Sequence, residues 1–258
     1  MSGSDDVRAW AHGRFEPTRE PVAGTVAADS WLVEDGLVLA LDRHRLRFAD
    51  AVADAGGDRA DALSAARRAM REVPTAGRWS PRLDLTPGGI RLRVRPVPAA
   101  GETATVVTAR RDPRTTPLRK GPDLEALGAL QAEESARAGT AVEPVILDGG
   151  AVAEGTWSAL LWWRGDALHV PAADIPRLPS VTAAVIAEVA RIDRVELREE
   201  RATPADLEGC EVWLANALRG IRTVERWIDG PRLAEPTRAS AWRERLAGLR
   251  ARPAEGGR

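Results

Sequence analysis

Short segments with the period of a β-strand alternate with longer segments with the period of an α-helix along most of the chain. Alternating or continuous apolar runs predict strands over 90–97, 103–108, 142–147, 151–154, 160–163, 167–170, 195–198, 211–216 and 223–228. Amphipathic spacing and capping residues predict helices over 42–56, 58–73, 122–138, 180–191 and 240–249. Residues 31–41 are expected to form a hairpin, whereas residues 1–30 show no clear period. This mixture indicates an α+β chain in two parts.

A short segment rich in proline and charge divides the two parts. Residues 110–118 carry two prolines, four charged side chains and two threonines, which is typical of a linker. We therefore expect a small N-terminal α/β domain over residues 1–109, a linker over 110–118 and a larger C-terminal domain over 119–258. The length of 258 residues suits one large domain or two ordinary ones.

The overall composition excludes several kinds of partner. The formal net charge is −1 and 44% of the residues are hydrophobic, so the chain can bury a core and lacks the basic excess that attracts nucleic acid or an anionic membrane. One cysteine, Cys210, and three scattered histidines give neither an internal disulfide nor a metal-ligand cluster. No signal peptide is visible, and the apolar stretch 159–163 is far too short to span a bilayer. These features predict a soluble cytoplasmic protein without a metal site.

The chain holds a single lysine. Lysine and arginine together number 37, only Lys120 is a lysine, and tyrosine is absent. A general drift toward arginine and alanine removes surface lysines, so a lysine that remains indicates a role that arginine cannot fill. Lysine can lose its proton and attack a carbonyl as a free amine, whereas arginine stays protonated. Composition supports equally the other interpretation, in which Lys120 is an exposed linker residue left by chance.

Four further segments could serve an anionic cofactor, although each also has an ordinary structural explanation. Glu154 ends an apolar strand and precedes a glycine, so its carboxylate could keep a pyridine nitrogen protonated or could be a turn residue. Residues 180–182 begin a helix, where free amide groups bind phosphate, and residues 216–220 form a loop of similar chemistry after a strand. Arg47 lies on a helix and could bind phosphate or face solvent.

Taken in order, these segments resemble the class IV aminotransferase family, also called fold type IV of the pyridoxal phosphate enzymes. The similar segments span about residues 29 to 229 and are 29–36, His44-x-x-Arg47, Arg119-Lys120-Gly121-Pro122-Asp123-Leu124, Glu154-Gly155, Leu178-Pro179-Ser180-Val181-Thr182 and Asn216-Ala217-Leu218. The resemblance implies a two-domain α+β fold of the D-amino-acid aminotransferase type, and it implies a homodimer.

The resemblance also implies roles for individual residues. The family's lysine in the position of Lys120 holds pyridoxal 5′-phosphate as an aldimine, and the acidic residue in the position of Glu154 faces the pyridine nitrogen. The arginine of the His-x-x-Arg motif, here Arg47, binds the cofactor phosphate. The two phosphate loops of the family correspond to Val181, Thr182, Asn216 and Ala217.

Within the family, the sequence is most similar to the aminodeoxychorismate lyases. The stretch Asn-Ala-Leu-x-Gly-Ile-Arg-x-Val at 216–224 and the stretches at 120–124 and 161–166 resemble lyase-like members. These lyases act on 4-amino-4-deoxychorismate, release pyruvate and leave 4-aminobenzoate, a folate precursor. Branched-chain transaminases carry a tyrosine five residues after the lysine, where this chain has Glu125. Residues 156–159 depart from the family pattern, as does the N-terminal motif, which leaves an unusual substrate open.

Three functions remain open on the sequence. The first is a lyase, the second is a transaminase that moves an amino group from an amino acid or amine to a keto acid, and the third is a binding protein that has lost the chemistry. Arg91, Arg93 and Arg95 alternate on one expected strand, so they could bind substrate carboxylates or could face solvent. Trp157 follows Glu154 closely and would shape the pocket beside the cofactor.

Overall fold

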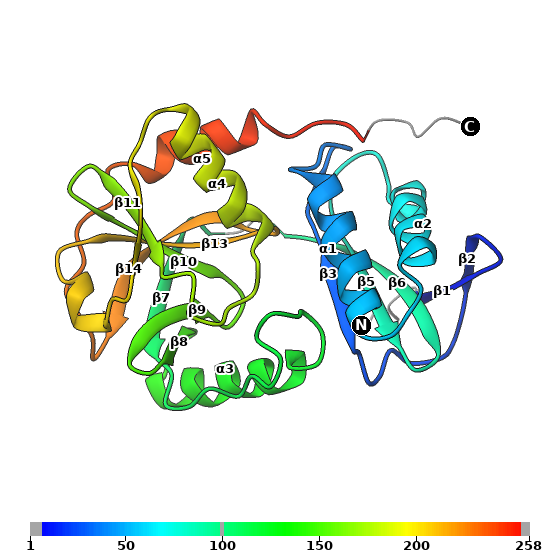
Figure 1. Ribbon diagram of the computed structural model, residues 1–258, viewed down its shortest axis with the longest axis horizontal. Coiled ribbons are helices and arrows are strands. Elements are labelled where there is room, and N and C mark those ends of the chain that lie inside the picture. Colours follow the sequence, from blue (N-terminus) through cyan, green and yellow to red (C-terminus); the bar gives the residue numbers. More distant parts are fainter. Residues whose placement is uncertain (1–6, 99–100, 254–258) are drawn as a thin grey trace. The chain divides into compact units, whose positions relative to one another are not determined.

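The computed structural model describes residues 7–98 and 101–253, which form two compact units (Figure 1). The first unit contains 7–98, 119–122 and 249–253, and the second contains 101–118 and 123–248. Among the described residues the first unit ends at 98 instead of the expected 109, so 101–118 belong to the second unit, and the chain returns to the first unit twice, at 119–122 and 249–253. The backbone N–H of Ala28 donates to the carbonyl of Lys120 (2.7 Å), and Val38 exchanges two backbone hydrogen bonds with Ala251 (2.9 and 3.0 Å).

The first unit is an antiparallel sheet covered by two helices. Its strands run in the order β2-β1-β6-β5-β3, with β4 beside β5. The strands are β1 (Val7–Ala11), β2 (Arg14–Pro17), β3 (Ala27–Ser30), β4 (Val33–Glu34), β5 (Arg78–Thr86) and β6 (Gly89–Pro96). The helices are α1 (Leu41–Asp54), α2 (Arg59–Ala69) and the 3-10 turn η1 (Met70–Glu72). Asp58 caps α2 by accepting hydrogen bonds from the backbone N–H groups of its first turn.

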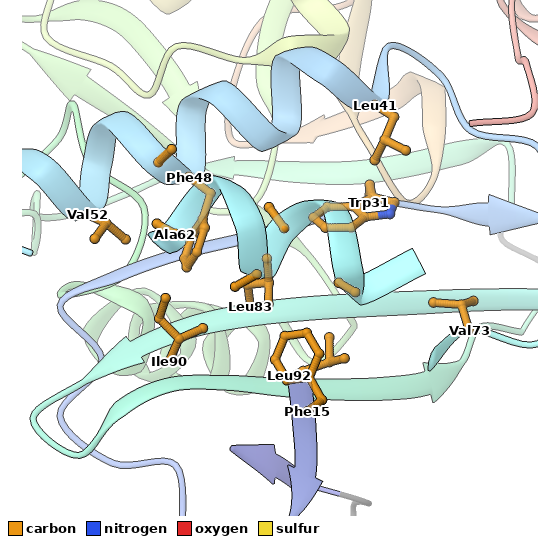
Figure 2. Close-up of a cluster of buried hydrophobic side chains, with 14 of the residues drawn as sticks. Phe15, Trp31, Leu41, Phe48, Val52, Ala62, Val73, Leu83, Ile90 and Leu92 are labelled. Atoms are coloured by element: carbon orange, nitrogen blue, oxygen red, sulfur yellow. The ribbon is translucent and has the colours of Figure 1, made fainter. Parts of the chain in front are cut away.

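Alternation along β5 and β6 gives this sheet one apolar face and one polar face. Leu83 and Leu92 are paired across the two strands and are completely buried against Phe48 of α1 (Figure 2). Because successive strand residues point to opposite faces, Arg82 and Asp84 lie on the face away from the helices. Charged side chains therefore lie together on the polar face of this sheet.

The second unit is a larger mixed sheet with three helices. Its strand order is β12-β11-β10-β13-β14-β7-β8-β9, and β9 also pairs with β10, so the sheet curls back on itself. The strands are β7 (Thr103–Thr108), β8 (Glu143–Asp148), β9 (Ala151–Gly155), β10 (Ala159–Arg164), β11 (Ala167–Pro171), β12 (Leu197–Glu200), β13 (Glu211–Asn216) and β14 (Gly220–Ile228). The helices are α3 (Leu124–Ala138), α4 (Val181–Ile192) and α5 (Ala239–Ala247), with the 3-10 turn η2 (Pro204–Leu207).

The core of the second unit is formed by strands that were predicted from apolar runs in the sequence. Val145, Leu160, Trp162 and Leu214 belong to one buried cluster. The short turn between β9 and β10 requires close packing, since a Cβ on Gly155 would lie 2.6 Å from Oε1 of Glu143. A side chain at position 155 would therefore displace the carboxylate of Glu143.

The α+β class and the expected helices are confirmed, and two strand expectations are corrected. The segment 1–30, which has no clear period, contains β1, β2 and β3 within its described part. The hairpin expected over 31–41 is reduced to β4 and a single bridge between Glu34 and Leu37, because Ala40 adopts a left-handed conformation and α1 begins at the next residue. In 7–98 and 101–253, no helix is long and apolar enough to cross a membrane.

Candidate active site

In the first unit, a buried carboxylate organises the start of α1. Asp29 on β3 is completely buried, and its Oδ1 lies 2.8 Å from Nδ1 of His44. Arg47, one turn further along α1, donates from Nε (2.7 Å) and Nη2 (3.0 Å) to the same carboxylate. Burial opposes the charge on Asp29, but Arg47 and His44 outweigh it and hold the pKa of Asp29 well below its usual range. Burial also lowers the pKa of His44, which favours the neutral form of this ring.

Lys120 reaches the same strand from the returning segment. Its Nζ lies 2.8 Å from the hydroxyl oxygen of Ser30, the residue after Asp29. The segment can approach β3 because the next residue is Gly121, with φ of 145°, where a Cβ would lie 2.8 Å from the backbone nitrogen of Ala27. Lys120 is thus held by backbone and side-chain contacts together.

The surroundings of Lys120 favour its neutral amine. Burial is the largest effect and lowers the pKa of Lys120 to about 8, against the opposing charge of Asp29. Arg47 and Arg82 lower the pKa further, while Asp84 raises it. With a pKa of about 8, about a tenth of the amine is unprotonated at pH 7, far more than for a free lysine.

The polar face of the first sheet pairs its arginines with acids. Asp84 is completely buried and accepts hydrogen bonds from Arg82 (2.6 and 2.9 Å) and Arg93 (2.7 Å). Arg91 is buried and pairs with Glu20, whereas Arg95 is exposed. The three arginines expected to share a face lie on β6 as predicted, but Arg91 and Arg93 already have carboxylate partners.

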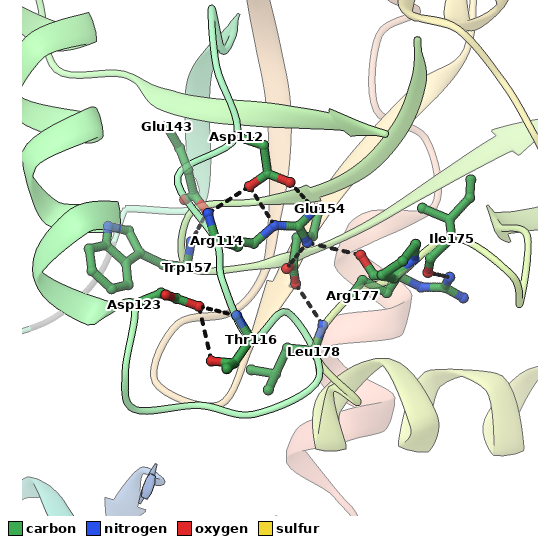
Figure 3. Close-up of polar contacts among 11 residues, drawn as sticks. Asp112, Arg114, Thr116, Asp123, Glu143, Glu154, Trp157, Ile175, Arg177 and Leu178 are labelled. Carbon is green, nitrogen blue, oxygen red and sulfur yellow. Dashed lines mark hydrogen bonds and ion pairs between the residues drawn. The ribbon is translucent and has the colours of Figure 1, made fainter. Parts of the chain in front are cut away.

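In the second unit, Glu154 is at the centre of a separate polar cluster (Figure 3). Its Oε1 accepts a hydrogen bond from Nη1 of Arg114 (2.6 Å), and its Oε2 accepts one from the backbone N–H of Leu178 (3.2 Å). Arg114 also binds both oxygens of Asp112 (2.9 and 2.8 Å) and the carbonyl of Pro176 (3.0 Å). Burial raises the pKa of Glu154, and Arg114 works against that shift.

The start of α4 has the geometry expected of an anion-binding helix end. Ser180 caps the helix by accepting a hydrogen bond from the N–H of Ala183 (3.2 Å). Val181 and Thr182 form the first turn and are buried. The first N–H groups of a helix have no partner within the helix, so this end suits a phosphate group.

The turn after β13 is shaped by Asn216. Its Oδ1 accepts hydrogen bonds from the backbone N–H groups of Leu218 (3.1 Å) and Arg219 (2.9 Å), and its Nδ2 donates to the hydroxyl of Ser158 (3.0 Å). Ala217 lies between Asn216 and Leu218 in this turn. Asn216 therefore fixes the conformation of the loop with its own side chain.

Trp157 lies partly exposed at the turn between β9 and β10. The residue is 38% exposed, and its ring nitrogen donates to Gln131 of α3. Its backbone N–H donates to Oε1 of Glu143 (3.1 Å), which in turn pairs with buried Arg222. The preceding hydroxyl, of Thr156, is buried and has no hydrogen-bond partner among the described residues.

Across residues 7–98 and 101–253, no group of three or more potential metal ligands is found.

A family model described as Amino-transferase class IV matches residues 27–227, most of the chain. The chain belongs to the class IV aminotransferase family. The resemblance drawn from the sequence motifs is thereby confirmed at the level of the family.

Solved structures of class IV proteins share the fold. A hypothetical aminotransferase from Mycobacterium tuberculosis, in its apo form, is 20% identical, covers 95% of this chain and 98% of its own, and has a TM-score of 0.74. The branched-chain amino acid aminotransferase of Escherichia coli is 17% identical with a TM-score of 0.77, covering 96% of this chain and 95% of its own. A fold IV transaminase from Curtobacterium pusillum is 19% identical with a TM-score of 0.73, covering 94% and 93%. No curated protein sequence matches the chain.

The predicted site residues of this class IV chain fall into two groups, one in each unit. Arg47 and Lys120 belong to the first unit and are linked through Asp29 and Ser30. The second unit holds the other residues that were predicted to bind the cofactor, which are Glu154, Val181, Thr182, Asn216 and Ala217.

Sequence reasoning missed several of the residues that hold these groups in place. The role of Asp29 and Ser30 was available in the motif 29–36, since a carboxylate and a hydroxyl precede the apolar run there. Arg114 lies in the segment interpreted as a linker, and nothing local connects it to Glu154, 40 positions away.

Proposed function

We propose that this class IV family member is an enzyme that binds pyridoxal 5′-phosphate through Lys120. The observation that carries the proposal is the environment of the only lysine, whose amine is held by Ser30 and has its pKa lowered to about 8. A primary amine that is partly neutral at pH 7 is what condensation with an aldehyde requires. Structures of similar fold include PLP-bound aminotransferases from Mycobacterium tuberculosis and Brucella abortus, which supports the choice of cofactor.

The chemistry of the available donors fits this cofactor. Glu154 offers a buried carboxylate for the ring nitrogen, and the helix start at Val181 and Thr182 offers amide groups for the phosphate. Arg47 uses its Nε and Nη2 for Asp29, so its contact with phosphate would come from the other edge of the guanidinium. Asn216 and Ala217 would add a second loop.

Pyridoxal phosphate supplies an electron sink for the electrons left when a bond at the substrate carbon breaks. With pyridoxal phosphate and substrate bound, a free Lys120 amine would be the base that accepts a proton from the carbon carrying the amino group and the acid that returns it elsewhere. Asp29 holds Arg47 in a fixed orientation for the phosphate. An ionised Glu154 would keep the ring nitrogen protonated.

For the reaction itself, we propose a lyase that acts on 4-amino-4-deoxychorismate or a related compound. Loss of pyruvate from this substrate leaves 4-aminobenzoate without any second amino-group acceptor. The lyase-like sequence at 216–224 and the absence of tyrosine support this choice. Among the expected substrate contacts, Arg95 and Trp157 are exposed. Arg91 and Arg93 pair with Glu20 and Asp84, so they would have to contact a substrate in addition to these carboxylates.

The second candidate is a class IV transaminase. It is favoured by the structures of similar fold, several of which are described as aminotransferases. The two reactions differ in one requirement, because only the transaminase needs a keto acid to turn over. Formation of 4-aminobenzoate and pyruvate without a keto acid would support the lyase, and strict dependence on a keto acid would support the transaminase.

We also expect a homodimer in the cytoplasm, which light scattering and cell fractionation would test.

The first experiment is a visible absorbance spectrum of the purified protein with and without pyridoxal phosphate. Wild type is expected to develop a yellow band that Lys120→Ala lacks. The chain offers an unusually clean control, since apart from the N-terminal amine no other amine can form the same band. Absence of the band from both proteins, even with excess cofactor, would refute the proposed enzyme and leave a binding protein of the family.

A further inference from the structure

We propose that Arg114 is a positioning residue for the cofactor, holding the Glu154 carboxylate and the loop that leads into α4 in one arrangement. The inference rests on the proposed function, because it concerns how the second unit presents its groups to pyridoxal phosphate. Arg114 would act through Glu154 and through the loop, without touching the substrate. No feature of the sequence assigns this residue a role.

The contacts of Arg114 join three separate segments of the second unit. Its Nη1 donates both to Oε1 of Glu154 at the end of β9 (2.6 Å) and to the carbonyl of Pro176 (3.0 Å). The other carboxylate oxygen of Glu154 accepts the N–H of Leu178 (3.2 Å). The loop is therefore bound twice, once to the arginine and once to its partner, two residues before the Ser180 cap of α4 (Figure 3).

The guanidinium of Arg114 is too fully used to bind a substrate. Its side chain is 4% exposed, and Nε and Nη2 form a bidentate pair with Asp112 (2.9 and 2.8 Å). Together with the two bonds from Nη1, four of its five N–H groups have protein acceptors. A buried arginine bound in this way is a fixed charge, and its effect is exerted on the groups that it contacts.

The charges around Glu154 set the direction of that effect. The groups that face Glu154 are Arg114, Asp112 and Arg177, and Arg177 donates to backbone carbonyls rather than to the carboxylate. Burial raises the pKa of Glu154, Asp112 raises it further, and Arg114 lowers it. Removal of Arg114 would leave the buried carboxylate beside Asp112, with Arg177 as the remaining cation, which does not donate to it. Glu154 would then become protonated at a higher pH and could no longer keep the ring nitrogen charged.

Titration of wild type and Arg114→Gln with pyridoxal phosphate tests the inference. We expect the Kd of Arg114→Gln to be roughly tenfold to a hundredfold higher, the factor that corresponds to one lost charged hydrogen bond. The acid limb of the pH profile of binding should move to higher pH. The phosphate of the cofactor and Lys120 titrate in both proteins, so the difference reports on Glu154. Arg114→Lys should lie between the two, because lysine keeps the charge without the bidentate geometry.

A measurement without cofactor separates this inference from the proposed function. In the apoprotein, amide hydrogen exchange at Leu178 should be faster in both Arg114→Gln and Glu154→Gln than in wild type. Arg243→Gln is the matched control, since Arg243 also binds a carboxylate and backbone carbonyls but contacts Glu102 and Ile221. It should change neither the exchange at Leu178 nor the Kd.

A double-mutant cycle decides whether Arg114 acts through Glu154. In a Glu154→Gln background, Arg114→Gln should change the Kd by less than about threefold. Equal Kd and equal Leu178 exchange in wild type and Arg114→Gln would overturn the inference, as would full additivity of the two substitutions. If wild type itself bound no pyridoxal phosphate, the proposed function would fall, whatever the exchange at Leu178 showed.

Discussion

The amino group of Lys120 lies among charged side chains of both signs. Arg47 and Arg82 lower its pKa, Asp29 and Asp84 raise it, and burial lowers it more than any of them. All four are held by partners of their own, so the electrostatic field around the amine is built into the first unit. The reactivity of this lysine is a property of β3, β5 and α1 rather than of the residues beside it in the chain.

The first prediction concerns the titration of this amine. Acylation of Lys120 by an amine-selective reagent, followed by mass spectrometry, should show a half-maximal rate near pH 8, because only the neutral amine reacts. Arg82→Gln removes a cation that lowers the pKa, so its midpoint should be higher. Arg14→Gln, whose partner is Glu16 on β2, should leave the midpoint unchanged. A midpoint near 10.4 in the folded wild type would contradict the described environment.

The second prediction concerns Asp29 and stability. Asp29→Asn leaves the partly buried Arg47 without its carboxylate, so the free energy of unfolding should fall by about 3 kcal/mol in urea denaturation. Asp42→Asn is the control on the same helix, since Asp42 is exposed and, within the described residues, pairs only with Arg45. It should change stability by no more than about 0.5 kcal/mol. Equal effects of the two substitutions would show that the Asp29 cluster is not a stabilising element.

Because the pKa of Asp29 is depressed in the folded protein, the ionised Asp29 adds to the free energy of unfolding at any pH above the pKa of an unfolded aspartate, about 3.9. This contribution is lost as the pH falls below that value toward the folded pKa. The difference in stability between wild type and Asp29→Asn should therefore shrink only in strong acid.

At the scale of the elements, the helices could be predicted from the sequence because their apolar spacing is local. The strands were harder. β3 is buried on both faces, so Ala27–Ser30 shows no alternation, and β5 contains Pro81, which obscures the alternation of Leu83 and Leu85. The attachment of 119–122 to β3 is a contact across 90 positions, and no local pattern encodes it.

The candidate site shows the same contrast between residues in local motifs and residues that depend on long-range contacts. Lys120, Arg47 and Glu154 could be proposed from the sequence because each belongs to a motif with a fixed residue order. Arg82 and Arg114 were missed because their importance comes from cross-strand pairing and from a loop that folds back. Periodicity and motifs indicate candidate residues for the chemistry, whereas long-range contacts decide which side chains surround those candidates.

The third prediction concerns the glycine that lets the returning segment reach β3. Gly121→Ala places a Cβ 2.8 Å from backbone atoms of Ala27, which cannot move aside easily, and φ of 145° is unfavourable for alanine. The segment should lift from β3, and the acylation midpoint of Lys120 should move from about 8 toward 10.4.

Gly139→Ala is the matched control for this change. Gly139 ends α3 with φ of 66°, and nothing lies within 4 Å of the Cβ that would be added. Its loss should cost about 1 kcal/mol of stability without moving the midpoint of Lys120. An unchanged midpoint in Gly121→Ala would show that the segment does not need this close approach.

At the scale of the whole molecule, the proposed cofactor should stabilise the folded chain. A ligand that binds only the folded state adds RT ln(1 + [L]/Kd), about 2.7 kcal/mol at a hundredfold excess over Kd. The Tm of wild type should therefore rise with the concentration of pyridoxal phosphate, and the rise should be largely lost in Lys120→Ala. Pyridoxine phosphate, which has no aldehyde, is a control expected to give a smaller shift. A Tm independent of cofactor in wild type would contradict specific binding.

The first unit is assembled from three stretches of chain, and the third of these is 249–253. Ala251 pairs with Val38 through two backbone hydrogen bonds, and Arg250 pairs with Glu34. On the ribosome, these contacts cannot form until residues 250 and 251 have emerged, long after their partners Glu34 and Val38. The second unit has all of its own residues by Gly248. Residues 34–38 are therefore translated before the second unit, yet their contacts with 250–251 are completed only after all residues of that unit have been made.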